Sequence, residues 1–199
     1  MAIIIDPGIT SSGCIVQNDT MEVYGSALQT NVNARGSMFV FSGGEATETA
    51  VNRGSMTVFE GGVASNTIIT VGQLYVSGGT AGKTTVNNRG RMEIYSGGTA
   101  SGAIVESGGR MVVSSGGAAD NTTVNYGGRM EVYSGGSASI VFNPWQGTIV
   151  SSAGAAVTYL ERDANIYFGS DSYFVSKTDL WVIMAGVFEG VRPLNQHKL

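Results

Sequence analysis

The chain contains few of the side chains that usually perform chemistry. Its 199 residues include one histidine, His197, and one cysteine, Cys14. A histidine-based catalytic centre or a His/Cys metal site needs several such residues together. No Cys-x-x-Cys, Gly-x-Ser-x-Gly or phosphate-loop motif occurs either. We therefore expect no catalytic residue, no metal site and no cofactor.

Carboxylates are the remaining candidates for catalysis, because pairs of acids can cleave glycosidic bonds. Glu22, Glu93 and Glu131 recur at one position of a repeat, but other residues separate them. The one cluster in sequence comprises Glu161, Arg162, Asp163, Asp171 and Asp179. We interpret this cluster as a solvated loop beside apolar strands, and a carbohydrate-active enzyme is the lesser alternative.

Serines and aromatic residues recur at regular spacing and are candidates for surface contacts. Four serines at the turns are candidate modification sites: Ser42, Ser96, Ser115 and Ser134. One exposed column is a candidate contact for a glycan or a protein: Tyr24, Phe41, Phe59, Tyr95 and Tyr133. Turn-forming serines and a cross-strand aromatic ladder are the structural alternatives. Ser77 and Ser114 interrupt the column, which argues against one continuous binding strip.

These side chains are positioned by an internal repeat over residues 21–149. Its first apolar position recurs every 17 to 19 residues, at Met21, Met38, Met56, Leu74, Met92, Met111, Met130 and Ile149. Two short apolar runs and two glycine corners per period predict two strands per coil. A repeat of this length is typical of a β-solenoid, in which stacked coils bury a continuous core.

The alternation within each copy predicts which residues face inward. Methionine at the first position and valine at the third should form the core, and the alanine after each Gly-Gly pair should fill a tight interior corner. The recurring asparagines are either a stacked amide ladder or ordinary turn residues: Asn33, Asn52, Asn87 and Asn125.

Charge argues against a nucleic-acid partner. The formal net charge is −4, and charged residues make up 13% of the chain. One repeat position does carry Arg91, Arg110 and Arg129, but Glu93 and Glu131 lie two residues further on. We therefore predict cross-strand charge pairing in place of a basic binding face.

The sequence as a whole predicts an all-β, single-domain β-solenoid of about 7–8 coils with a C-terminal β cap. Residues 1–20 are expected to form a degenerate first coil or N-terminal cap, residues 21–154 the repeat, and residues 155–199 a cap or oligomerisation segment. The expected cap or oligomer interface is the apolar run Leu180, Trp181, Val182, Ile183 and Met184. Self-association through this segment is therefore expected. No apolar stretch is long enough for a membrane helix.

The repeat resembles that of AIDA-type autotransporter adhesins. Residues 96–109 read Ser-Gly-Gly-Thr-Ala-Ser-Gly-Ala-Ile-Val-Glu-Ser-Gly-Gly, and Arg-Met-Val-Val-Ser-Ser-Gly-Gly-Ala-Ala follows. Arg35, Arg53 and Arg89 stand where the family repeat has the first glycine of a corner. The resemblance implies a right-handed β-helical stalk of a Gram-negative surface protein, with a glycosyltransferase as partner and with glycans on its serines and threonines.

The expected function is therefore a non-enzymatic structural or adhesive module with a protein or glycan partner. The expected location is the cell surface or the medium, as part of a larger protein. The N-terminus lacks the features of a signal peptide. The alternative is therefore an intracellular, cytoplasmic interaction protein or self-assembling β-solenoid, of the kind that a phage or mobile element could encode. The single cysteine fits either compartment.

Overall fold

A computed structural model of the chain describes residues 2–141, 143, 146–160, 165–168 and 171–174. Every regular element within these residues is a β-strand, which confirms the all-β prediction. None of the described residues forms a helix with the length and apolar character needed to cross a membrane. The chain divides into two units, residues 1–160 and residues 161–199.

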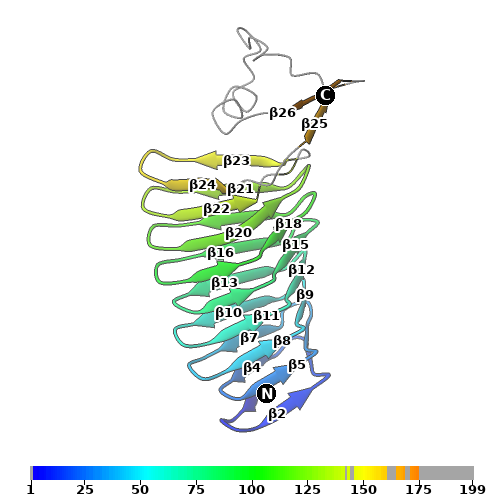
Figure 1. The fold of residues 1–199 in the computed structure, drawn as a ribbon. Coiled ribbons are helices and arrows are strands. Elements are labelled where there is room, and N and C mark those ends of the chain that lie inside the picture. The colour runs from blue at the N-terminus through cyan, green and yellow to red at the C-terminus, as the bar shows by residue number, and fades with distance from the viewer. Residues whose placement is uncertain (1, 142, 144–145, 161–164, 169–170, 175–199) are drawn as a thin grey trace. The chain divides into compact units, whose positions relative to one another are not determined.

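The first unit is a β-solenoid of nine coils, in which each strand pairs in parallel with its equivalent in the next coil (Figure 1). Coils 1–6 have three short strands each, not the two that we predicted. The segment after each Gly-Gly pair, which we expected to be a corner, is itself extended and forms the middle strand. The coil count also exceeds the prediction because both degenerate ends form coils.

The strands lie on three faces. Face 1 is a sheet of nine strands: β1 (Ile3–Ile5), β4 (Thr20–Val23), β7 (Ser37–Val40), β10 (Ser55–Phe59), β13 (Gln73–Ser77), β16 (Arg91–Ile94), β19 (Arg110–Val113), β21 (Arg129–Val132) and β23 (Thr148–Ser151). Face 2 contains β2 (Thr10–Ser12), β5 (Ser26–Leu28), β8 (Glu45–Thr47), β11 (Val63–Ser65), β14 (Thr80–Gly82), β17 (Thr99–Ser101), β20 (Ala118–Val124), β22 (Ser137–Val141) and β24 (Ala156–Leu160).

Face 3 contains β3 (Ile15–Val16), β6 (Asn31–Val32), β9 (Ala50–Asn52), β12 (Ile68–Thr70), β15 (Thr85–Asn87) and β18 (Ile104–Val105). Faces 2 and 3 join into one sheet of 15 strands because β20 pairs with both β17 and β18. The ninth coil includes β24, which pairs with β22, so the expected domain boundary at residue 155 falls within this coil.

The core is built from columns of like residues stacked in register. Met56, for example, pairs with Met38 on one side and Leu74 on the other, and all three are fully buried. This confirms that the first and third positions of the repeat face inward. The recurring alanines are also buried, but they are the middle residues of face 2 strands and not corner residues. Ala46, Ala64 and Ala81 are aligned in this way.

A column of buried threonines begins face 3. It comprises Thr30, Thr49, Thr67, Thr84 and Thr122, each no more than 1% exposed. Their hydroxyl oxygens have no hydrogen-bond partner within the described part of the chain. The interior of the solenoid therefore accommodates a small polar side chain at the start of face 3.

Three corners join the faces, and in most coils each corner has a residue in the left-handed conformation. Corner 1, between faces 1 and 2, uses glycine throughout coils 3–8, for example Gly43 at φ +79°. The following Gly44 is needed for a different reason, since a Cβ there would lie 2.2 Å from the carbonyl oxygen of Val23. The Gly-Gly pairs therefore provide both the turn and the close backbone approach.

Corners 2 and 3 often place larger residues in the left-handed conformation. Corner 2, between faces 2 and 3, uses Gln29, Glu48, Asn66, Lys83 and Asn121. Corner 3, between face 3 and face 1 of the next coil, uses Asn18, Arg35, Arg53, Val71 and Arg89, and then Gly108 and Gly127. Such a residue costs about 1–2 kcal/mol relative to glycine.

The described part of the second unit is an antiparallel pair of strands, β25 (Asn165–Phe168) and β26 (Asp171–Phe174). The expected cap or oligomer interface at residues 180–184 lies outside the described residues. Glu161, Arg162, Asp163 and Asp179 of the carboxylate cluster also lie outside them.

Candidate functional site

The four candidate serines occupy one edge of the solenoid, at corner 1. Each is exposed and immediately precedes the left-handed glycine of its coil: Ser42, Ser96, Ser115 and Ser134. The Ser42 Oγ lies 2.5 Å from the place where a Cβ of Gly61, in the next coil, would be. Ser115 has the same relation to Gly135, also at 2.5 Å. The glycine of the next coil therefore presents no side chain to the hydroxyl at either position.

One further serine has the same surroundings, and our sequence reasoning missed it. Ser107 is exposed at corner 3, precedes the left-handed Gly108, and places its Oγ 2.5 Å from the Cβ position of Gly127. The triplet Ser107-Gly108-Gly109 repeats the Ser-Gly-Gly pattern of corner 1 and could have identified it.

The aromatic residues on the outer side of face 1 form separate groups. Tyr24 stacks on Phe41 with ring centroids 4.8 Å apart, and Phe41 stacks on Phe59 at 5.1 Å. Phe39 lies against both phenylalanines of this group, at 6.4 and 6.1 Å. Burial raises the pKa of the Tyr24 hydroxyl.

The other two members of the predicted column lie elsewhere on the face. Tyr95 contacts Tyr75 at 6.3 Å, and its hydroxyl donates a hydrogen bond of 2.8 Å to Glu93, which raises the pKa of Tyr95. Tyr133 has no ring contact among the described residues and donates to Glu131 at 3.0 Å. The structure therefore brings together Tyr24, Phe41 and Phe59 only.

The arginine column of face 1 is paired with acids, as the spacing predicted. Arg91 Nε lies 2.7 Å from Glu93 Oε1. Arg110 donates two hydrogen bonds to Glu131, of 2.9 and 2.7 Å, and Arg129 donates a third of 2.6 Å. The bonds from Arg110, and then those from Arg129, lower the pKa of Glu131 to about 2. This face is therefore charge-compensated.

The acids do not converge in the described part of the chain. Val112 separates Glu93 from Glu131 in the stack. No group of three or more His, Cys, Asp or Glu side chains is arranged to hold a metal ion within the residues that the structure describes.

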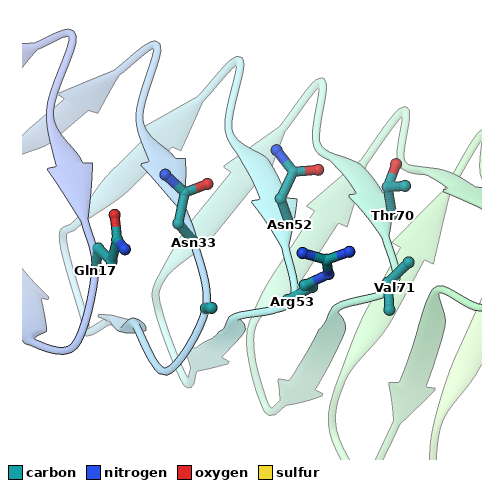
Figure 2. A pocket seen from close by; sticks show the side chains of 7 residues that line it. Gln17, Asn33, Asn52, Arg53, Thr70 and Val71 are labelled. Carbon is teal, nitrogen blue, oxygen red and sulfur yellow. The ribbon is translucent and has the colours of Figure 1, made fainter.

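A groove follows corner 3 at the N-terminal end of the stack. It has a volume of about 390 Å³ and is lined by Gln17, Asn33, Ala34, Asn52, Arg53, Thr70 and Val71. Figure 2 shows these side chains projecting from successive coils. We refer to it as the corner 3 groove.

The asparagine column differs between the two ends of the stack. Asn125 donates a hydrogen bond of 3.0 Å to Glu106, and Asn143 donates one of 3.4 Å to Asn125. Toward the C-terminal end the column therefore contains one amide–amide bond and one amide–carboxylate bond, and the four predicted asparagines do not bond to one another in a ladder. Asn33 and Asn52 instead face the corner 3 groove (Figure 2).

Comparisons with known proteins point to one family. A family model described as "Adhesin of bacterial autotransporter system, probable stalk" matches residues 96–143. Among solved structures, the chain is similar to the crystal structure of a TibC-catalysed, hyper-glycosylated fragment of TibA, with 35% sequence identity and a TM-score of 0.74. This match covers 79% of the chain and 58% of that fragment. A search of curated proteins finds no match. The comparisons therefore support an AIDA-type autotransporter adhesin repeat, matched directly by the family model over residues 96–143.

Proposed function

We propose that this chain is a structural and adhesive stalk module of an autotransporter passenger, exposed on the surface of a Gram-negative bacterium. The observation that carries the proposal is the match of the stalk model to residues 96–143. The nine-coil stack supports the stalk role, because a rod of stacked coils can hold a contact surface away from the cell.

We further propose that the corner 1 serines carry O-linked glycans added by a glycosyltransferase. The related TibA fragment is hyper-glycosylated by TibC. In this chain, Ser42, Ser96, Ser115 and Ser134 are exposed, and the residue of the next coil nearest to each Oγ is a glycine without a side chain. Ser107 is the fifth acceptor on the same grounds.

Co-expression with TibC followed by intact-mass analysis and peptide mapping tests the modification. We expect added mass on the five serines, and loss of that mass when they are changed to alanine. The matched control changes Ser37 and Ser55, whose half-buried hydroxyls lie 3.2 Å apart, and should leave the added mass unchanged. Unmodified protein, or sugars confined to other positions, would contradict the assignment.

Adhesion requires a separate measurement. The chain should be displayed on a non-adhesive bacterium within a complete autotransporter, and attachment and cell aggregation should be compared with those of a passenger that lacks it. We expect both to increase. No gain in either, with surface exposure verified by antibody labelling, would reject the adhesive role.

A further inference from the structure

Three arginines stand at corner 3 where the backbone favours glycine. Arg35, Arg53 and Arg89 have φ angles of +60°, +61° and +63°. The equivalent residues in the sixth and seventh coils are Gly108 and Gly127, which take the same conformation without strain. Strained residues of this kind are concentrated at functional sites. Corner 2 also has such residues, so the conformation alone does not define a site, and the side chains must be considered.

Five of the seven residues that line the corner 3 groove can form hydrogen bonds, and Ala34 and Val71 are its apolar members. Gln17, Asn33 and Asn52 contribute amides, Thr70 a hydroxyl and Arg53 a guanidinium. A second hollow of about 260 Å³ continues along the same corner and adds Arg35 to Arg53. No carboxylate lines either hollow. The groove therefore presents hydrogen-bonding groups and positive charge without an acid to neutralise it.

These groups have no partners in the described part of the chain. No hydrogen bond or ion pair involves the side chains of Asn33, Asn52, Arg35 or Arg53 there. The arginines of face 1 differ, because each of them forms a salt bridge with Glu93 or Glu131. Asp19, the acid at corner 3 of the first coil, accepts a hydrogen bond of 2.8 Å from the amide of Thr20.

We propose that the corner 3 groove binds an acidic glycan, a chain of sugars that carries carboxylate or sulfate groups. Arg35 and Arg53 would receive the anionic groups through charge-assisted hydrogen bonds. The amides of Asn33 and Asn52 would bind sugar hydroxyls. The groove crosses four coils, which are spaced at about 4.8 Å, so an extended chain fits it better than a compact ion. Its lining lacks the aromatic rings on which the bases of a nucleic acid would stack.

This inference deepens the proposed adhesive role by assigning a partner class, and its biological meaning rests on that role. The binding itself can be measured on the purified chain. If the purified chain binds the glycan but the displayed chain does not promote adhesion, only the adhesive role is rejected. If the displayed chain promotes adhesion but the purified chain does not bind the glycan, only the assignment of the groove as a glycan site is rejected.

Isothermal titration calorimetry with polygalacturonate, heparin and neutral dextran tests the groove. We expect one or both acidic polymers to bind, with an affinity that falls as salt screens the charges, and dextran not to bind. Binding of polygalacturonate but not heparin would identify carboxylates as the recognised group, and binding of heparin but not polygalacturonate would identify sulfates. Equal binding of dextran, or no binding of either acidic polymer, would overturn the proposal.

Substitutions by glycine separate binding from folding. Arg35→Gly and Arg53→Gly should each weaken binding of the acidic polymer by about tenfold, while the unfolding temperature holds or rises because strain is relieved. The matched control is Lys83→Gly at corner 2, where φ is +50°, since it removes the same charge and a similar strain. Its affinity should equal that of the wild type. Unchanged binding in both arginine variants, or an equal loss in Lys83→Gly, would show that the groove is not the site.

Discussion

At the scale of single residues, Glu131 is the most strongly held charge on face 1. Its carboxylate receives hydrogen bonds from Arg110 of one coil, from Arg129 of its own coil and from the Tyr133 hydroxyl. It is only 7% exposed. Since these bonds favour the ionised form, the carboxylate links two neighbouring coils as long as it remains charged.

This linkage predicts an acid-dependent loss of stability. The pKa of Glu131 falls from its usual 4.5 to about 2 on folding. Its contribution is therefore fully present above about pH 4.5 and is lost as the pH falls toward 2. Glu131→Gln should lower the free energy of unfolding at pH 7 by roughly 1–2 kcal/mol.

Chemical denaturation of both proteins between pH 7 and pH 2 measures this effect. The difference between wild type and Glu131→Gln should shrink as the pH falls. Glu45→Gln, on the exposed side of face 2, is the control and should behave as the wild type. A difference that is independent of pH would show that the carboxylate charge does not stabilise the fold.

The charge pairs and the core columns could be predicted from the sequence, but the corner 3 groove could not. Alternation in a strand fixes which side chains face inward, and a spacing of two residues places Arg129 beside Glu131 on the outer side. The groove depends instead on residues from different coils that meet at a corner, such as Gln17, Asn33 and Asn52. In the sequence, the groove is indicated only by Arg35, Arg53 and Arg89, which stand where the family repeat has glycine.

At the scale of elements, the middle strands show why the number of strands per coil was underestimated. Each face 2 strand of coils 1–6 has three residues, and in β8 only Ala46 is buried. One inward alanine gives no alternating pattern, so the segment resembles a turn. The face 3 strands were predicted because each carries an inward apolar residue, such as Val51, beside the buried Thr49.

The second glycine of the pair at corner 1 should tolerate no larger residue, as should the tightest glycines at corner 3, such as Gly109. A Cβ at Gly44 would lie 2.2 Å from the carbonyl oxygen of Val23, a backbone atom that cannot move aside without opening the stack. Gly44→Ala should therefore destabilise the protein by about 3 kcal/mol or more. Thermal unfolding followed by circular dichroism measures the loss.

Gly82 provides the matched control within a strand of face 2. Its φ is not in the left-handed range, and the nearest atom to an added Cβ is 3.8 Å away. Gly82→Ala should leave the unfolding temperature unchanged or slightly raised, since alanine loses less backbone entropy on folding. Equal destabilisation by the two substitutions would mean that the close approach at corner 1 does not govern stability.

At the scale of the whole first unit, each coil contacts mainly the coils next to it. The first strands follow the order β1-β4-β7-β10-β13-β16-β19-β21-β23 with no crossover between distant coils. In such a stack, stability is the sum of similar contributions from each coil and each junction. A complete coil should therefore be removable.

Deletion of residues 92–110 removes one period, since Met92 and Met111 are register partners. The shortened protein should fold with the same β-sheet circular dichroism and an unfolding temperature several degrees lower. Deletion of residues 92–101 is the control, because it removes about half a coil and disrupts the alignment of the core columns. Loss of structure in both variants would indicate that the stack folds only as one indivisible unit.

The direction of the hydrogen bonds between coils has a mechanical consequence. These bonds run along the stack, from one strand to its equivalent in the next coil, and β1 and β23 lie at opposite ends of face 1. A pull on the two ends therefore strains a single junction at a time instead of shearing many bonds together. Each coil that detaches releases 17 to 19 residues, or roughly 60 Å of extended chain. Under flow, the rod would lengthen in regular steps and act as an extensible tether.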